Sequence, residues 1–135
     1  MKLLQSKVLL EGYARGPVLK LTADISFWGG VDPLSGEIIH RQHPQFGESV
    51  AGKILAMQRS IGSSSGSSVL LELFRRGRAP LGIILVEVDL VISLAAVVAR
   101  EMKFGNIPLV CVNSSVFFNL PDVVTINQSG EIRPG

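Results

Sequence analysis

The first half of the chain carries short apolar runs that are typical of β-strands. SKVLLEGYARG and PVLKLTADISF are two of them, and Gly16-Pro17 between them predicts a turn. SFWGGVDPLSGEIIH is interrupted by glycine and proline, which predicts a loop. Val50 to Arg59 then predicts a further strand. We therefore expect this half to be mainly β.

A helical pattern begins after a run of seven glycines and serines, residues 62–68. Apolar side chains recur at helical spacing over residues 69–74, and charged side chains occupy the other side. Gly77 is a candidate C-cap for this helix, and Pro80 lies just beyond it. The Gly/Ser run therefore joins a predicted strand to a predicted helix.

The remaining sequence predicts alternating strands and a second helix. LGIILVEV is a continuous apolar run, as expected for a strand that is buried on both faces. Asp89 is a candidate N-cap for a helix from about Leu90 to Met102, which Gly105 and Pro108 would end. PLVCV and DVVTI predict two more strands, with a turn at Ser129-Gly130. We expect an α/β fold in which a β-rich first half packs on a β-α-β-α-β second half.

Two segments raise the question of membrane insertion or export. The stretch from Pro80 to Ala99 is nearly long enough to cross a bilayer, but Glu87 and Asp89 lie at its centre. Charges there cost a few kcal/mol each in lipid, so a strand followed by a helix explains it better. The N-terminal apolar runs are short and interrupted by polar residues, so no export signal is evident.

Composition narrows the class of protein. A chain of 135 residues is about one domain, and we expect a single domain over residues 1–135. Apolar residues make up 47% and charged residues 18%, so part of the surface is expected to need a partner. Basic residues are scattered and the net charge is +2, which argues against nucleic-acid binding. The single cysteine, Cys111, excludes an internal disulfide and favours the cytoplasm.

The Gly/Ser run is the candidate functional element. A flexible linker should join independent units, whereas this run lies inside one small domain. At a strand-to-helix junction, glycine permits positive φ and serine caps free amides, so an anion binds well there. A plain N-cap serine with spare neighbours explains the same letters and stays open.

Four motifs resemble, in order, the small swivelling domain of the aconitase X group: SFWGGVDPLSGEII, HPQFGESVAGKIL, IGSSSGSSVLLELFRRGRAP and the later IPLV. The resemblance implies a swivelling β/β/α domain. Within that group, stand-alone chains of this size are similar to the small subunit of phosphomevalonate dehydratase, a two-subunit hydro-lyase of the archaeal mevalonate route to isoprenoids. A relative in the group dehydrates cis-3-hydroxy-L-proline, which gives the alternative substrate.

The resemblance assigns roles within the Gly/Ser run. It implies that Ser63 is the base that takes the proton alpha to the substrate carboxylate, and that Ser64 helps to bind that carboxylate. Gly62 and Ser65 complete the expected substrate-binding loop. Aconitase proper has an arginine where this chain has Ser65, which suggests a different substrate anion or an arginine from the partner.

The same resemblance implies an iron–sulfur (4Fe–4S) cluster, which cysteine thiolates hold. Cys111 alone cannot supply that ligand set, and its apolar strand favours a buried structural thiol. We therefore expect the cluster on a large, cysteine-bearing subunit, and we expect the chain to be inactive alone. The implied reaction converts mevalonate 5-phosphate to anhydromevalonate 5-phosphate.

Other residues offer alternative functions. His40, Arg41 and His43 could form a histidine phosphocarrier or a phosphate clamp, although a solvated loop explains them and two histidines are a weak metal signal. Ser26 and Trp28 could serve packing, a subunit interface or the site. A non-catalytic module that only binds an anion at the loop is the remaining class.

Arg75, Arg76 and Arg78 follow the end of the first predicted helix, where positive charge is favoured by the helix dipole. A phosphate bound there would lie at the far end of the helix from Ser63. We therefore do not expect these arginines to bind the substrate.

Overall fold

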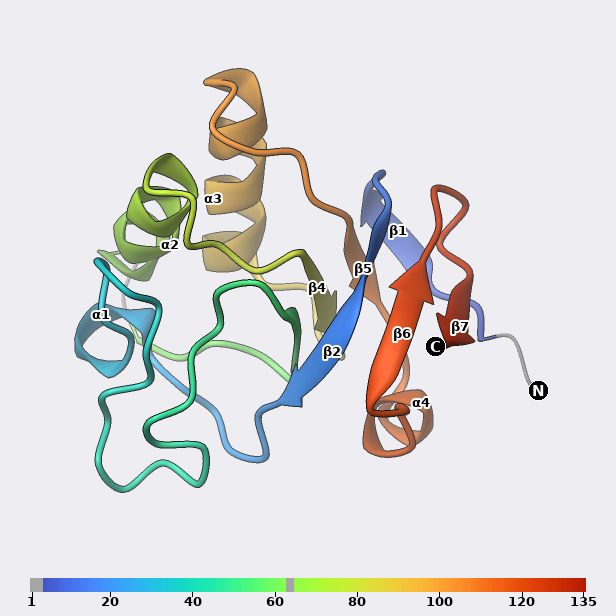
Figure 1. Cartoon of the computed structure of the whole chain (residues 1–135), viewed down its shortest axis with the longest axis horizontal. Helices are drawn as coiled ribbons and strands as arrows, with labels where there is room; N and C mark the ends of the chain where they lie inside the picture. Colours follow the sequence, from blue (N-terminus) through green and yellow to red (C-terminus); the bar gives the residue numbers. More distant parts are fainter. Residues whose placement is uncertain (1–3, 63–64) are drawn as a thin grey trace.

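A computed structural model describes residues 4–62 and 65–135 of the chain, and Figure 1 shows its course. The elements in chain order are β1 (Lys7–Leu10), β2 (Ala14–Lys20), α1 (Phe27–Gly30), β3 (Ile54–Met57), α2 (Ser65–Arg75), β4 (Gly82–Leu85), α3 (Leu90–Glu101), β5 (Leu109–Cys111), α4 (Ser114–Phe118), β6 (Val123–Ile126) and β7 (Ile132–Pro134). The predicted α/β class of swivelling type is confirmed. The strand expected over Val50 to Arg59 forms only in its centre, as β3.

The strands form one curled sheet in the order β1-β5-β4-β3-β2-β6-β7. Strands β2, β3, β4 and β5 are parallel to one another, and β1, β6 and β7 pair antiparallel at the two sides. The sheet curls far enough for Leu4 and Ile132 to exchange backbone hydrogen bonds of 2.9 and 2.8 Å. The strands of the first half therefore share one sheet with those of the second half.

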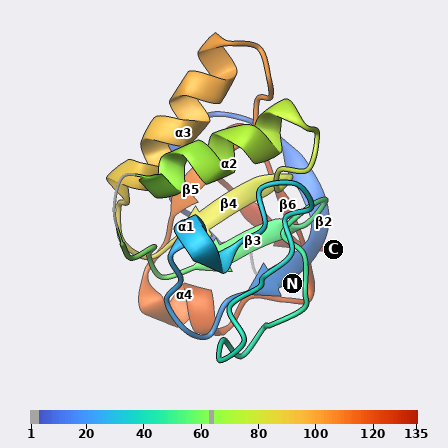
Figure 2. The same ribbon diagram turned by 90° about the vertical axis from the view of Figure 1, so that its left-hand side faces the viewer.

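The curl separates two hydrophobic cores, and β3 contributes to both. Leu55 and Met57 face the core shared with α2 and α3, whereas Ile54 and Ala56 face the core inside the curl. Side chains alternate between the faces of a strand, so a run of four apolar residues fills both cores. The neighbouring β4 is also buried throughout, which confirms the expectation for LGIILVEV. Figure 2 shows α2 and α3 side by side over the parallel strands.

The turn predicted at Gly16-Pro17 is wrong, because both residues lie within β2. Pro17 pairs with Val123 of β6, and pairing of β2 with β3 starts only at Val18. Pro17 has no N–H to donate. It lies in a part of β2 that has a neighbouring strand on one side only, where proline is tolerated. The break between the first two strands falls at Gly12, where an added Cβ would lie 2.7 Å from the Pro108 nitrogen.

The first long helix, α2, ends as predicted. Gly77 has φ +69, and hydrogen bonds join Arg78 N–H to Leu73 O at 2.8 Å and Gly77 N–H to Phe74 O at 3.1 Å. This pair of bonds is the Schellman motif, which favours glycine at the left-handed position.

The predicted end of α3 is corrected. Asp89 caps its start as expected, but Lys103, with φ +60, takes the left-handed position at its end in place of Gly105. Phe104 N–H bonds Ala99 O at 2.8 Å in the same Schellman geometry. Gly105 has a packing role instead, because an added Cβ would lie 2.7 Å from Phe74.

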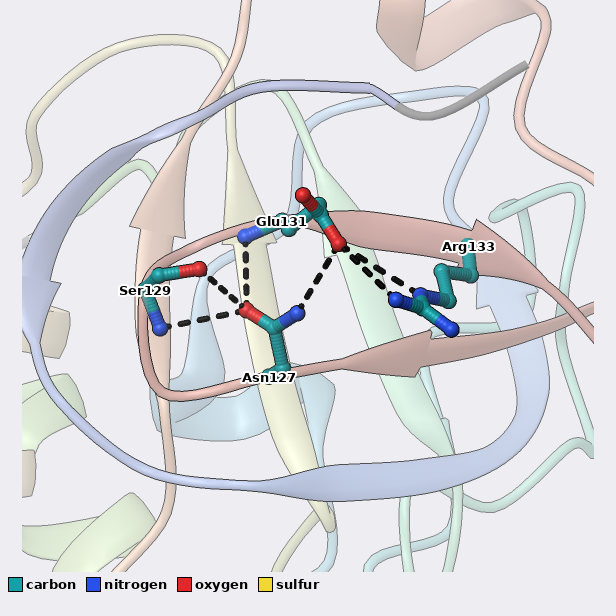
Figure 3. A network of polar contacts seen from close by, with 4 residues as sticks. All are labelled: Asn127, Ser129, Glu131 and Arg133. Carbon is teal, nitrogen blue, oxygen red and sulfur yellow. Dashed lines mark hydrogen bonds and ion pairs between the residues drawn. The ribbon is translucent and has the colours of Figure 1, made fainter.

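The sequence analysis missed α4 and β7, which are five and three residues long, and the four-residue α1, which lies in the segment expected to be a loop. The turn expected at Ser129-Gly130 is confirmed, and it joins β6 to β7. One oxygen of Asn127 holds it by accepting hydrogen bonds from Ser129 N–H, Ser129 Oγ and Glu131 N–H at 3.1, 2.6 and 3.0 Å (Figure 3). Glu131 in turn pairs with Arg133 at 3.2 Å.

We predict that Lys103→Gly stabilises the chain by up to about 1 kcal/mol, because glycine avoids the left-handed strain of a side chain with a Cβ. The matched variant Gly77→Ala should destabilise it by about 1 kcal/mol at the equivalent position of α2. Urea denaturation of both variants measures the two signs. A destabilised Lys103→Gly variant would mean that the Lys103 side chain contributes more than its backbone strain costs.

Candidate functional site

The Gly/Ser run connects β3 to α2 at the carboxyl edge of the parallel strands. Figure 2 shows α1 and the starts of α2 and α3 gathered at this edge. Ile61 and Gly62 are exposed, and Ser65 opens α2. Ser63 and Ser64, the predicted base and carboxylate ligand, lie outside the described residues.

The segment before the run is attached to α1 and its leading loop. Ser60 pairs with Ile25 in a parallel bridge, and Ile61 N–H donates to Ile25 O at 2.9 Å. Gly62 has φ +95, and a Cβ there would lie 2.6 Å from Ser26 Oγ. Glycine adopts this positive φ without strain and has no Cβ to collide with Ser26, which explains why the first residue of the run, residue 62, is glycine.

A buried carboxylate attaches the same segment to α3. Asp89 is 7% exposed, and its Oδ1 caps the helix by accepting from Ile92 N–H at 3.1 Å. Its Oδ2 accepts from Ser60 N–H at 2.6 Å and from Ser60 Oγ at 2.5 Å. The sequence predicted the cap but not the bonds to Ser60, because no local pattern links residues 29 positions apart.

An ion-pair group lies beside this attachment. Arg59 pairs with Glu87 at 2.6 Å and with Asp24 at 3.2 Å. The hydrogen bond that Arg59 donates to Glu87 and the charges of Asp24 and Glu87 raise the pKa of Arg59. The group links the segments that follow β2, β3 and β4, and its two carboxylates outnumber the one guanidinium, so it offers no net positive charge to an anionic ligand. The sequence analysis did not identify it.

A pocket of about 350 Å³ opens next to Ile61. Its polar lining comes from Asp24, Ser26, His40, Gln42 and His43. The structure thus brings Ser26 and both histidines, three candidates from distant parts of the sequence, to the side of the Gly/Ser run. Hydroxyl, imidazole and amide groups of this kind suit the polar groups of a small hydroxy acid.

The histidine cluster divides into one buried and one exposed residue. His43 is 6% exposed, its Nε2 lies 3.0 Å from Ala23 O, and its Nδ1 lies 3.0 Å from Gln45 N–H. The hydrogen bonds assign a neutral ring that donates through Nε2 and accepts through Nδ1. Both nitrogens are occupied, which argues against a phosphocarrier role for His43. His40 is exposed at the pocket.

The arginines at the end of α2 have their own partner. Arg75 and Arg76 both donate to Glu72 at 2.7 Å. These hydrogen bonds lower the pKa of Glu72 to about 2, so the carboxylate stays charged at neutral pH. The arrangement supports the prediction that these arginines have a structural role.

The described residues do not fit a metal cluster. Cys111 is half-buried in β5 and its Sγ donates to Val86 O at 3.0 Å. Burial raises the pKa of its thiol, which disfavours the thiolate that metals bind. Across residues 4–62 and 65–135 there is no group of three or more His, Cys, Asp or Glu side chains placed to hold a metal ion. Within the same ranges no helix has the length and apolar character needed to span a bilayer.

Comparisons with known proteins point to one family. A family model described as the aconitase X swivel domain matches residues 3–133. The chain is 45% identical over 109 residues to cis-3-hydroxy-L-proline dehydratase of Pseudomonas aeruginosa. The aligned residues make up 81% of this chain and 19% of that protein. The chain is 33% identical over 129 residues to the phosphomevalonate dehydratase small subunit of Methanosarcina acetivorans, which covers 93% of this chain and 85% of that subunit.

A solved structure agrees with these matches. The crystal structure of Thermococcus kodakaraensis aconitase X in its holo form superposes with a TM-score of 0.86 at 31% identity, and the match covers 98% of both chains. The chain spans about a fifth of the length of the cis-3-hydroxy-L-proline dehydratases that it matches.

We predict that Gly62→Ala destabilises the chain for two reasons, the left-handed backbone and the contact with Ser26. Gly47→Ala is the matched control, because Gly47 has a similar φ of +89 and open space around its Cα. The control should cost about 1 kcal/mol, and Gly62→Ala about 1 kcal/mol more. Equal free energies of unfolding, measured in urea, would show that Ser26 does not restrict the run.

Proposed function

Because this chain belongs to the aconitase X swivel-domain family, we propose that it is the small subunit of a two-subunit dehydratase and that Ser63 accepts a proton from the substrate. The resemblance drawn from the sequence is thereby confirmed at the level of the family. The proposal takes residues 1–135 as one swivel domain. The observation that carries it is the position of the Gly/Ser run, which leads into α2 at the carboxyl edge of the parallel strands and follows a segment, Ser60 and Ile61, that is bonded to Ile25 and Asp89.

The proposed substrate is mevalonate 5-phosphate, and the product is anhydromevalonate 5-phosphate. The proton passes from C2 to the Ser63 oxygen and the hydroxyl leaves from C3, so that the elements of water are lost. Backbone amides at the start of α2, with Gly62, Ser64 and Ser65, bind the substrate carboxylate, because the positive end of the helix dipole favours an anion. The same donors stabilise negative charge on the Ser63 oxygen.

The pocket beside Ile61 receives the rest of the substrate. Ser26, His40 and Gln42 supply hydrogen-bonding groups at one side of it, from segments that do not carry the base. Gly62 touches Ser26, so the two parts of the site are continuous.

A second substrate has its own support. Identity is higher to the cis-3-hydroxy-L-proline dehydratase than to the phosphomevalonate dehydratase small subunit quoted above, whereas that small subunit matches over most of its own length. The higher identity is the observation that favours the hydroxyproline substrate as the second candidate. The assay must therefore include both substrates.

The partner is proposed to dock around the Gly/Ser run. Four large apolar side chains, which we call the apolar rim, are exposed there: Trp28 at 63%, Ile61 at 50%, Val88 at 54% and Leu90 at 80%. They flank the residues that bond to one another at this edge, and the nearby Arg59 is already paired. Exposed apolar side chains around a polar site are typical of a protein interface.

We assign the iron–sulfur cluster to that large, cysteine-bearing subunit, because the described residues of this chain do not fit one. The single cysteine favours a cytoplasmic enzyme.

We predict that Ser63→Ala lowers kcat of the co-expressed pair by ~10² or more, since a proton acceptor is removed. Association of the two subunits should be unchanged, and Ser115→Ala on α4 serves as a control that keeps activity. Turnover of mevalonate 5-phosphate and of cis-3-hydroxy-L-proline is measured for each variant. Near-normal turnover in Ser63→Ala would favour a non-catalytic anion-binding module.

We predict that Leu90→Glu weakens association with the large subunit by at least about tenfold, as expected for a buried interface residue. A carboxylate in the first turn of α3 favours the helix dipole, so the fold should be kept. Tyr13→Glu is the control, because Tyr13 is 60% exposed and lies outside the apolar rim. Equal dissociation constants for the two variants, measured by calorimetry, would show that the apolar rim is not part of the interface.

A further inference from the structure

Asp89 uses its two carboxylate oxygens for two different elements. Oδ1 serves α3, and Oδ2 serves Ser60 at the end of the neighbouring strand. Helix capping alone needs one oxygen, and serine, threonine or asparagine would supply it. A carboxylate is distinguished by having two acceptor oxygens and no donor. The second oxygen therefore needs an explanation beyond the cap.

The cost of burying this charge makes the second set of bonds significant. A carboxylate that is 7% exposed must be compensated by hydrogen bonds. Asp89 receives three, from Ile92 N–H, Ser60 N–H and Ser60 Oγ, together with the favourable field at the start of α3. Two of the three come from Ser60, at distances of 2.6 and 2.5 Å, which is short for a neutral donor and typical of a charged acceptor.

Ser60 lies just before the Gly/Ser run. It stands three residues before Ser63, so the chain between them spans at most about 10 Å. Ile61 is already bonded to Ile25 on the other side, and Gly62 is held against Ser26. Ser60, Ile61 and Gly62 are thus held between the segment before α1 and the start of α3.

We propose that Asp89 is a positioning residue for the Ser63 base, acting through Ser60. This inference rests on the proposed function, because it gives Asp89 a part in the same reaction. Ser63 must reach the substrate proton within a few tenths of an ångström, and the buried carboxylate fixes the approach of the chain relative to the start of α3. The cap alone would leave the Gly/Ser run attached only through α1.

Three variants separate capping from positioning. Asp89→Ser keeps an N-cap oxygen but loses the second acceptor, and we expect kcat of the co-expressed pair to fall by about 10²-fold, the effect of a misplaced reacting group. Asp89→Asn keeps the shape and the cap but turns an amide N–H₂ toward the Ser60 N–H, and should also lower kcat. Ser60→Ala leaves the cap untouched and removes one bond, so it should have the smallest effect. Ser129→Ala, which removes a 2.6 Å hydroxyl bond in the β6–β7 turn, is the matched control with unchanged kcat.

Amide hydrogen exchange in the full chain gives a readout that does not depend on the reaction. Exchange at Ile61 and Gly62 should accelerate in Asp89→Ser, whereas the amides in the middle of α3 keep their protection. Acceleration confined to α3 would show that Asp89 acts as a cap only, and would overturn the inference.

The outcomes also separate this inference from the proposed function. Unchanged kcat in both Asp89→Asn and Ser60→Ala, with an inactive Ser63→Ala, overturns the positioning role and leaves the base in place. An active Ser63→Ala removes the proposed function, and the exchange at Ile61 and Gly62 then still decides whether Asp89 holds the run. If Asp89→Ser does not fold, Asp89→Asn and Ser60→Ala decide between the two results.

Discussion

Burial of β3 and β4 on both faces is the constraint from which the rest of the structure follows. Their side chains alternate between the helix-side core and the core inside the curl, and almost none of their surface reaches solvent. Polar groups cannot be placed along such strands without a large desolvation cost. They are therefore concentrated immediately beyond the strand ends, where Arg59, Ser60, Glu87 and Asp89 meet. The site lies at this edge because the cores occupy the faces.

The polar groups at that edge fall into an outer and an inner set. The outer set, Arg59 with Asp24 and Glu87, is exposed and screened by water, so it is expected to contribute little to stability. The inner set, Asp89 with Ser60, is buried, and its hydrogen bonds act in a less polar surrounding. The difference in burial gives the two sets different roles. The outer set lines the surface that the proposed partner would cover, and the inner set fixes the residues just before the Gly/Ser run.

Sequence reasoning succeeded where the signal is local. The amphipathic spacing of α2, the cap at Asp89 and the apolar run of β4 each lie within one element, and all three were predicted. Gly16-Pro17 was misinterpreted because proline is tolerated where β2 has one neighbour, a fact that depends on the order of strands. Elements as short as α4 and β7 show too few residues for a period to be recognised.

The candidate site shows the same limit more sharply. The Gly/Ser run was identified from its letters and from the family resemblance. Asp89, which is bonded to Ser60 just before the run, was identified only as a helix cap, since its second partner follows a different strand. His43 carries an imidazole, a group that often takes part in catalysis, yet both of its ring nitrogens are used in hydrogen bonds to backbone atoms. The roles of both residues depend on contacts between different segments of the fold, and the spacing of residues along the sequence does not reveal such contacts.

The pairing of Leu4 with Ile132 has a consequence for how such domains combine with other proteins. It brings the two edges of the sheet together, and Figure 1 shows β1 and β7 on the side away from α1 and α2. A peptide attached at either end would leave the molecule from the same region without passing over the Gly/Ser run. The fold thus accommodates both arrangements found among its relatives: a small subunit that this chain matches over 85% of its length, and a longer protein of which it spans 19%.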